Sequence, residues 1–149
     1  MKAHIDAVRL AQTPDGAVPV VVIGVEHDSD VLPIFIGFTE ADAISRGLEA
    51  SDIGRPLTHD LLLDVIEELG SRITGITISG IREDTYLADI HIDTPRGSVT
   101  IDARPSDSLA LAARTNAPIE VEPSVYDRGR RDPEQFASLT RLREAVEYR

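Results

Sequence analysis

The sequence predicts an α+β fold, in which a mixed, mainly antiparallel sheet and several short helices form a single compact domain. Segments with strand and helix patterns are mixed along the chain without strict alternation, which argues against a doubly wound parallel sheet. Tight-turn sequences join neighbouring strand segments. With 149 residues and a hydrophobic content of 42%, the chain can bury one hydrophobic core but is too short to form two separate domains.

The first third of the chain predicts a three-stranded meander. Residues 3–10 and the apolar run 18–25 flank a turn at 13–16, where Pro-Asp-Gly is strong turn chemistry, so the two segments should form a hairpin. A second turn leads to a third strand over residues 31–37, whose Pro33 indicates a sheet edge or a bulge.

Two amphipathic helices are predicted next. The first covers residues 39–50, with Thr39 as its N-cap and Asp42 as the capping-box partner; its apolar face comprises Ala41, Ile44 and Leu48. The second covers residues 58–69 and stops at Gly70. Its apolar stripe comprises Leu61, Leu62, Val65, Ile66 and Leu69.

The following third returns to strands at residues 72–81, 85–93 and 97–103, and a turn at 94–97 joins the last two. Alternation in the middle strand predicts one buried face and one wet face. The wet face carries three residues whose spacing resembles that of metal ligands, but we favour a solvated face for them: Asp89, His91 and Asp93.

A helix over residues 106–115, a short strand over 117–123 and a final helix that opens at Asp132-Pro133 complete the prediction. The apolar side of the final helix comprises Phe136, Leu139, Leu142 and Val146. We therefore divide the chain into a domain over 1–127 and a linker with a C-terminal amphipathic helix over 128–149.

The composition restricts both location and chemistry. No apolar run has the length of a membrane span and the N-terminus lacks signal-peptide features, so we expect a cytoplasmic protein with no membrane partner. Because the chain has no cysteine, any metal must bind carboxylate, imidazole, carbonyl or water, which favours Mg or Mn.

The net charge of -11, with Lys2 as the one lysine, is typical of a halophilic protein in a salt-adapted cytoplasm. The alternative is a GC-rich gene with a merely acidic product. In either case composition alone argues against a nucleic-acid partner, because acidic surfaces repel phosphate backbones.

Two short stretches, "RPLTHD" at 55–60 and "RPSD" at 104–107, repeat an Arg-Pro, hydroxyl and Asp pattern before apolar runs. Thr58 and Ser106 are the predicted N-caps of the two helices, and Asp60 and Asp107 fall in the first turns. Capping does not require an arginine beside each helix start, where the free amides already carry positive charge.

Arg55 and Arg104 therefore define two potential sites for a phosphate or carboxylate. The alternative is that both arginines reach acids within the protein and brace the junctions, with Asp107, Asp102 or Glu40 as partners.

His59 lies between a predicted cap and an acid, so it could act as a general base or as a metal ligand beside Asp60. Asp102 at a strand end and Asp107 at the next helix start could hold a divalent cation. The sequence contains none of the common nucleotide-binding, serine-hydrolase or zinc-protease motifs.

Four separated blocks carry a resemblance: "VLPIFIGFTEADAI" at 31–44, "RPLTHDLLLDVIEELG" at 55–70, "DARPSDSLALAAR" at 102–114 and "APIEV" at 117–121. In this order and spacing they closely resemble the bifunctional nuclease (BFN) domain family over roughly residues 1–127. The resemblance implies a compact α+β domain, often a homo-oligomer, with nuclease activity on RNA and DNA in some members.

The positions that match the family's motifs are also those selected on physical grounds: Glu40, Arg55, Thr58, His59, Asp60, Asp102, Arg104, Ser106 and Asp107. Our first hypothesis is a phosphodiester hydrolase. Its catalytic residues would be His59, Asp60, Asp102, Asp107 and Glu40, its phosphate-binding residues Arg55, Arg104, Thr58 and Ser106, and its metal ligands Asp102 and Asp107.

The rival hypothesis is a non-catalytic module. In it, the two Arg-Pro helix starts bind a small anion or brace a protein-interaction surface, and the last helix joins subunits or docks a partner.

Overall fold

A computed structural model describes residues 1–50 and 54–145. It contains seven strands: β1 (Lys2–Thr13), β2 (Gly16–Val25), β3 (Val31–Phe35), β4 (Arg72–Arg82), β5 (Thr85–Thr94), β6 (Gly97–Ala103) and β7 (Ile119–Val121). The helices in the described residues are α1 (Phe38–Glu49), α2 (Thr58–Glu68), α3 (Pro105–Thr115), α4 (Pro123–Gly129), α5 (Glu134–Ala137) and α6 (Leu142–Ala145). The predicted α+β class is confirmed.

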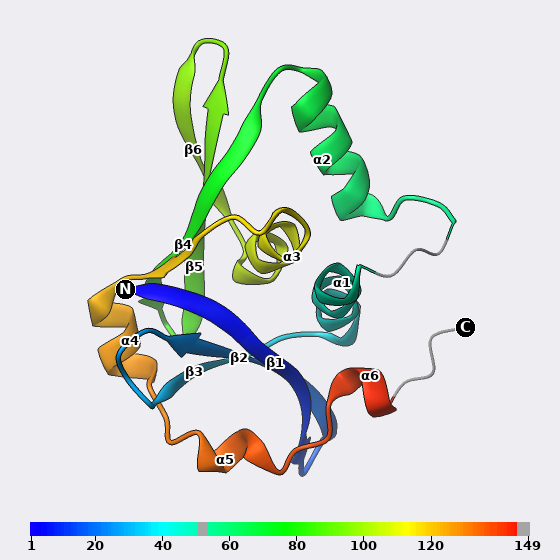
Figure 1. Cartoon of the computed structure of the whole chain (residues 1–149). Helices are drawn as coiled ribbons and strands as arrows, with labels where there is room; N and C mark the ends of the chain where they lie inside the picture. The colour runs from blue at the N-terminus through cyan, green and yellow to red at the C-terminus, as the bar shows by residue number, and fades with distance from the viewer. Residues whose placement is uncertain (51–53, 146–149) are drawn as a thin grey trace.

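The strands form one sheet in the order β3-β2-β1-β7-β4-β5-β6, so two antiparallel meanders are joined through the short strand β7 (Figure 1). β7 runs parallel to β4 and antiparallel to β1. Pro33 lies in the edge strand β3, as its sequence position predicts. α4 follows directly after β7 and contacts β3 and β4.

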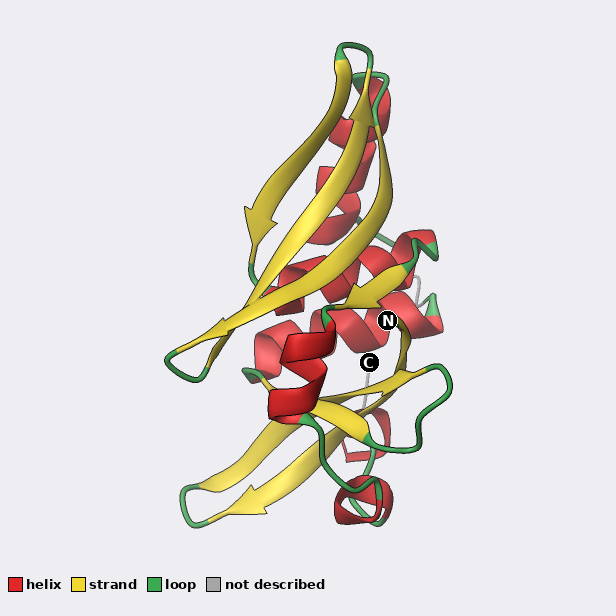
Figure 2. Cartoon of the chain, turned by 90° about the vertical axis from the view of Figure 1, so that its left-hand side faces the viewer, coloured by secondary structure: helices red, strands yellow, loops and turns green. Residues whose placement is uncertain are grey.

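Helices α1, α2 and α3 lie on one face of the sheet, and the other face of β4, β5 and β6 is open (Figure 2). The core joins the covered face to α1 and α3 and includes Ile23, Leu32, Ile44, Ile76, Ile78, Leu109 and Leu111. On the open face, His91 Nε2 lies 2.8 Å from the hydroxyl of Thr77. Ala88, Ile90 and Ile92 of β5 are buried, whereas Asp89, His91 and Asp93, which alternate with them, are partly exposed, so the predicted solvated face of β5 is confirmed.

All three predicted N-caps are shifted. α1 begins after Gly37, so Thr39 is already helical, and Asp42 forms an ion pair with Arg46 instead of a capping box. The N-cap of α2 is Leu57, one residue before Thr58.

At α3 the N-cap is Arg104, because Pro105 occupies the first helical turn, where its fixed φ and missing N–H suit a helix start. Ser106 is consequently buried within the helix.

The predicted apolar stripe of α2 mostly faces away from the core. Leu61, Leu62, Val65 and Leu69 have exposed fractions between 43% and 70%, whereas the neighbours that contact the core are Leu63 and Ile66. The helix is apolar on more than one side, so periodicity could not distinguish the buried side.

The C-terminal segment is not one helix. It forms α5 and α6, and their residues Phe136 and Leu142 are buried against the protein's own core. Arg9 donates a hydrogen bond of 2.7 Å to the carbonyl of Leu139, which ties the segment to β1. Its apolar side is therefore used internally, while Val146 lies outside the described residues. Within the described part of the chain, no helix has the length and hydrophobicity to cross a membrane.

Candidate functional site

A polar network joins the starts of α1, α2 and α3. His59 Nε2 lies 3.0 Å from Oδ1 of Asp107. The guanidinium of Arg104 donates to both oxygens of Asp107, at 3.0 and 3.3 Å, and to Oε1 of Glu40 at 3.3 Å. We call these four residues, His59, Asp107, Arg104 and Glu40, the tetrad. Sequence analysis selected all four, and the fold brings them together.

The backbone around Gly37 gives Glu40 its position. A Cβ atom on Gly37 would collide with Oε2 of Glu40, so the carboxylate lies directly against the helix start. The φ of Gly37 is -76°, which any residue adopts, so the glycine leaves room for the carboxylate and is not needed for its backbone conformation.

Electrostatics favour the ionised forms within the tetrad. Partial burial raises the pKa of Asp107, but hydrogen bonds from Arg104 and His59 outweigh it, and the pKa lies below its ordinary value. Hydrogen bonding to Asp107, with a smaller contribution from Glu40, raises the pKa of Arg104. Asp107 is therefore a carboxylate at neutral pH, suited to orient the imidazole of His59.

His59 has one ring nitrogen available. Its side chain is 18% exposed, and Nδ1 makes no hydrogen bond to any described residue. An imidazole held by a carboxylate at one nitrogen can exchange a proton at the other, which is the arrangement used in general acid–base catalysis.

Asp60, the other acid of the two Arg-Pro stretches, braces the fold. Its Oδ2 accepts a hydrogen bond from the Leu57 amide, and its Oδ1 accepts one of 2.8 Å from Arg114 Nε. Burial raises the pKa of Asp60, but the hydrogen bonds from these two partners lower it by more, so the net pKa is below its ordinary value.

The partner of Asp60, Arg114, was missed by sequence reasoning. Its side chain is 8% exposed, and Nη1 also donates to the carbonyls of Ala43 and Ala110. Arg114 thus connects α1, α2 and α3. The available signal was an arginine on the otherwise apolar face of α3, where a buried charge requires a partner.

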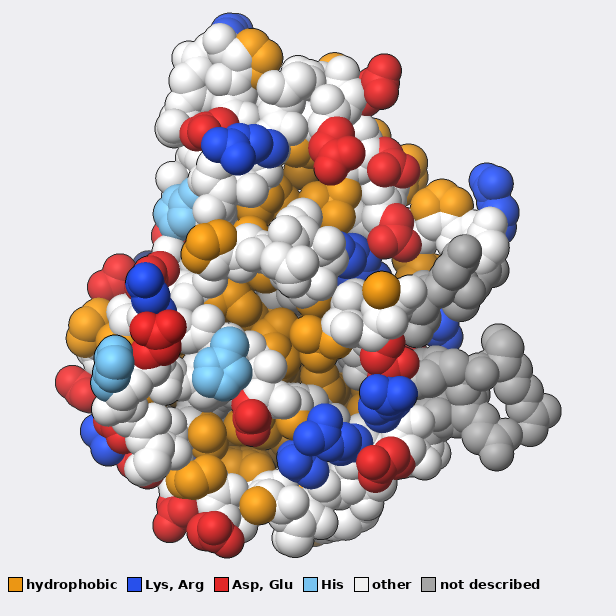
Figure 3. All heavy atoms as spheres, in the orientation of Figure 1, with side chains coloured by type: hydrophobic (Ala, Val, Ile, Leu, Met, Phe, Trp, Pro, Cys, Tyr) orange, Lys and Arg blue, Asp and Glu red, His pale blue; other side chains and the backbone are white. Residues whose placement is uncertain are grey.

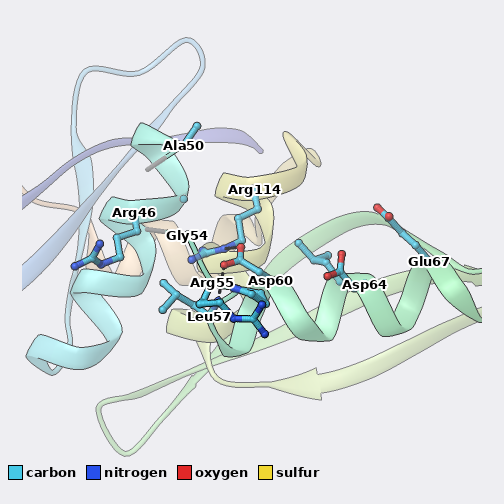
Figure 4. Close-up of a pocket in the computed structure, with 12 residues that line it drawn as sticks. Arg46, Ala50, Gly54, Arg55, Leu57, Asp60, Asp64, Glu67 and Arg114 are labelled. Atoms are coloured by element: carbon cyan, nitrogen blue, oxygen red, sulfur yellow. Dashed lines mark hydrogen bonds and ion pairs between the residues drawn. The ribbon is translucent and has the colours of Figure 1, made fainter. Parts of the chain in front are cut away.

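The two Arg-Pro stretches open into different cavities. Arg55 lines a cavity of about 540 Å³ between α1, α2 and α3, together with Arg114, Asp60 and Asp64 (Figure 4). Arg104 lines a separate cavity of about 320 Å³ with Glu40 and Ser106. Thr58 lines neither cavity.

Asp102 is not part of the tetrad. It pairs with Asp89 across β5 and β6, whereas the adjacent pair Ala88 and Ala103 faces the core, so strand alternation directs Asp102 to the open face. Its side chain contacts no other described side chain by hydrogen bond or ion pair. Within residues 1–50 and 54–145, no group of three or more His, Asp or Glu side chains is arranged to hold a metal ion.

Two aromatic residues that sequence analysis did not select, Phe35 and Tyr86, also line the Arg104 cavity. An aromatic residue at a strand end carries no motif, so the sequence alone gave no reason to place either ring at the site.

Comparison with known proteins shows which proteins this chain is related to. The family model for the bifunctional nuclease domain matches residues 21–133. An uncharacterized protein of Mycobacterium tuberculosis is 39% identical over 107 residues, which cover 72% of this chain and 63% of that protein. Bifunctional nuclease 2 of rice (Oryza sativa subsp. japonica) is 28% identical over 122 residues, covering 78% of this chain and 37% of the rice protein. Bifunctional nuclease 2 of Arabidopsis thaliana is 23% identical over 94 residues, covering 61% of this chain and 29% of that protein.

The fold is a mixed α+β domain in which a hydrogen-bonded polar network, the tetrad, lies at the meeting point of three helix starts. The family match extends over most of this domain, and the chain belongs to the bifunctional nuclease domain family. It spans 63% of the length of the mycobacterial relative and smaller shares of the plant relatives.

Proposed function

We propose that this protein is a nuclease that hydrolyses phosphodiester bonds of RNA or DNA, and that the tetrad is its active site. The observation that carries the proposal is the hydrogen bond between His59 and Asp107 beside the exposed guanidinium of Arg104. The family supports the reaction class, because its rice and Arabidopsis members bear the name bifunctional nuclease.

In this proposal, His59 is the general base. Its Nδ1 takes a proton from the attacking water, whose oxygen forms the new bond to phosphorus. The resulting imidazolium remains paired with Asp107, and it returns the proton to the leaving oxygen as the scissile P–O bond breaks. Asp107 thus fixes the orientation of the ring and offsets its transient positive charge.

Arg104 stabilises the charge that develops on the phosphate. A guanidinium has five N–H groups, and three nitrogen-to-oxygen contacts engage Glu40 and Asp107. Two N–H groups therefore remain for phosphate oxygens, and the exposed side chain can present them to a substrate. Glu40 holds the guanidinium from the opposite side.

The other predicted site residues take supporting roles in the proposal. Asp60 positions α2 through Arg114, and Ser106 contributes to the wall of the Arg104 cavity. Arg55 and Thr58 lie beyond that cavity. His59 and Asp107 also lie outside the lining of that cavity, so this placement does not exclude Arg55 or Thr58, and both stay in the proposal as phosphate-binding residues.

A divalent cation remains a separate part of the proposal. Bound Mg or Mn would activate water and neutralise negative charge. Sequence analysis proposed Asp102 and Asp107 as the ligands, but strand alternation directs Asp102 to the opposite face of the sheet, so the pair does not fit one shared cation. Asp107 is the carboxylate that a cation bound together with substrate phosphates would use. Both oxygens of Asp107 already accept hydrogen bonds, so Arg104 or His59 would have to yield one of them.

We also propose that the protein forms a homo-oligomer through the exposed apolar side of α2. The chain buries few of the leucines on this helix, and contiguous exposed apolar surface is typical of an interface. Apolar side chains also gather in the hollow between α2 and the strands opposite it (Figure 3). Light scattering should show an oligomer, and Leu62→Asp should dissociate it; a wild-type monomer would remove this part of the proposal.

The decisive experiment compares wild-type protein with His59→Ala, purified identically, on fluorescent single-stranded RNA and DNA with and without Mg or Mn. Cleavage by the wild type and its loss in His59→Ala would support a nuclease and exclude a contaminant. Equal cleavage by both proteins would remove the tetrad assignment. Binding without cleavage by either would favour the rival hypothesis of an anion-binding module.

A further inference from the structure

The cavity beside Arg104 continues into a second one. The Arg104 cavity, of about 320 Å³, and a neighbouring cavity of about 460 Å³ share two walls, Phe35 and Tyr86. Arg131 lines the far cavity. We call this surface, from Arg104 past Phe35 and Tyr86 to Arg131, the aromatic groove.

Phe35 is unusual in its own strand. The four preceding residues of β3 are buried, but Phe35 at the strand's end is 55% exposed. β3 is an edge strand, where an exposed aromatic ring invites unwanted association unless a partner uses it. The chain contains three phenylalanines, and this one lines the cavity that Arg104 and Glu40 also line.

Tyr86 lines the same groove from β5, and its hydroxyl lies close to the backbone of Gly129. A Cβ atom on Gly129 would lie 2.5 Å from the Tyr86 hydroxyl, so the absence of a side chain at Gly129 makes room for the ring. The two aromatic residues come from strands of different meanders, and each lines both cavities.

Two arginines, Arg131 and Arg128, lie near Tyr86 at the far end of the groove. Burial raises the pKa of Tyr86, and the nearby guanidinium groups of Arg131 and Arg128 act against that rise. Neither arginine forms an ion pair with an acid of the described residues; Arg131 donates to the Arg130 carbonyl and Arg128 to the Ile81 carbonyl. In a chain of net charge -11, these two cations make the Arg131 end of the groove attractive to a phosphate, whereas the Arg104 end also contains the acids Glu40 and Asp84.

We propose that the aromatic groove binds single-stranded nucleic acid, with unpaired bases stacked on Phe35 and Tyr86 and phosphates at Arg104 and Arg131. Every base has a π-face, so stacking accepts RNA and DNA of any sequence, while a duplex keeps its base faces covered. This inference rests on the proposed nuclease function, because it supplies the substrate class of the same site. A strand held between the two arginines would reach Arg104 and Glu40, the two members of the tetrad that line the groove.

The test measures binding by fluorescence anisotropy in a His59→Ala background, so that cleavage does not consume the probe. The probes are a labelled oligothymidine, a labelled oligouridine and a labelled DNA duplex. Phe35→Ala should weaken binding of both single strands by about tenfold, which is about 1.4 kcal/mol. Protein that carries His59→Ala alone should also bind both single strands more tightly than the duplex.

Phe38→Ala is the matched control. Phe38 is 50% exposed and lies three positions after Phe35, but it lines neither cavity. Its substitution should change binding less than twofold. Arg131→Gln should reduce the salt dependence of binding by about one phosphate contact. Because all three side chains are on the surface, matching thermal melts should verify folding.

The inference is overturned when Phe35→Ala and Phe38→Ala bind the single strands equally, or when the duplex binds as tightly as they do. The result also separates this inference from the nuclease proposal. If the wild type cleaves but substitution of Phe35 has no effect, the groove inference is wrong and the nuclease proposal stands. If binding depends on Phe35 but neither the wild type nor any variant cleaves, the groove inference is supported and the nuclease proposal is wrong.

Discussion

The Nε2 atom of His59 lies 3.0 Å from Oδ1 of Asp107, although the two residues are 48 positions apart and belong to different helices. Such a contact is expected to act as a unit, because the carboxylate orients the ring that transfers the proton. Residues that act as a unit give non-additive losses when they are substituted together.

We therefore predict that His59→Ala lowers the cleavage rate by about 10²- to 10⁴-fold and that Asp107→Asn lowers it less. The double variant should be no slower than His59→Ala alone. Rates on a quenched fluorescent oligonucleotide give the three values. If the two single losses multiply in the double variant, the residues act independently and the paired assignment is wrong.

Gly37→Ala should affect activity more than stability. The new methyl group would displace the Glu40 carboxylate, the flexible end of a side chain, so folding should lose less than about 1 kcal/mol. Arg104 would then lose its contact with Glu40, and the cleavage rate should fall about tenfold.

Two controls isolate this effect. Gly80→Ala places its Cβ 3.4 Å from Leu87, an ordinary contact, and should leave the rate unchanged. In a Glu40→Ala background, Gly37→Ala should cause no additional loss. A further loss in that background would mean that Gly37 acts on the site by another route.

Much of the fold could be predicted because local signals coincide with the final structure. The Pro-Asp-Gly turn fixes the hairpin of β1 and β2, and alternation in β5 distinguishes its wet face from its buried face. The position of β7 between the two meanders could not be predicted, because its pairing with β1 and β4 depends on contacts between segments far apart in the sequence.

The site shows the same division. The Arg-Pro pattern indicated Arg104 and named Asp107, Asp102 or Glu40 as its possible partners; the structure pairs it with Asp107 and Glu40. Asp60 pairs with Arg114, 54 positions away, and this partner has no local signature. Asp102 was grouped with Asp107 by sequence proximity, whereas strand alternation directs it to the opposite face of the sheet.

Arg114→Met should destabilise the protein by roughly 2 to 4 kcal/mol. The substitution removes hydrogen bonds to Asp60, Ala43 and Ala110 and leaves buried acceptors without their donor. Urea unfolding followed by circular dichroism measures the change. Arg55→Met is the matched control, since Arg55 lines the same cavity without an ion pair in the described residues; equal stability of the two variants would contradict a bracing role for Arg114.

Stability should fall in acid because Asp60 and Asp107 have depressed pKa values in the folded state. Below the ordinary value of 3.8, the unfolded chain takes up protons that the folded protein does not, so the free energy of unfolding decreases as pH falls. The contribution is fully present at neutral pH and is lost as the pH drops through the folded-state pKa values.

Unfolding free energies measured from pH 6 down to about pH 3 test this dependence. Asp107→Asn should show a shallower acid loss than the wild type. Asp102→Asn removes a carboxylate without a described side-chain partner and should keep the wild-type slope. An identical slope in Asp107→Asn would mean that its ion pairs do not contribute to acid sensitivity.

Removal of divalent cations separates two versions of the proposed mechanism. When a cation on Asp107 and the substrate phosphates takes part, EDTA should abolish cleavage and added Mg or Mn should restore it. Asp102→Asn should leave the required Mg concentration unchanged, because Asp102 lies on the opposite face of the sheet. Calorimetry of Mn²⁺ binding, with and without a non-cleavable oligonucleotide, should show tighter binding in the presence of the oligonucleotide, because its phosphates supply further oxygen ligands. Cleavage that EDTA leaves unchanged would remove the cation from the mechanism, and the proton transfer would then depend on His59 and Asp107 with Arg104 as the remaining positive charge.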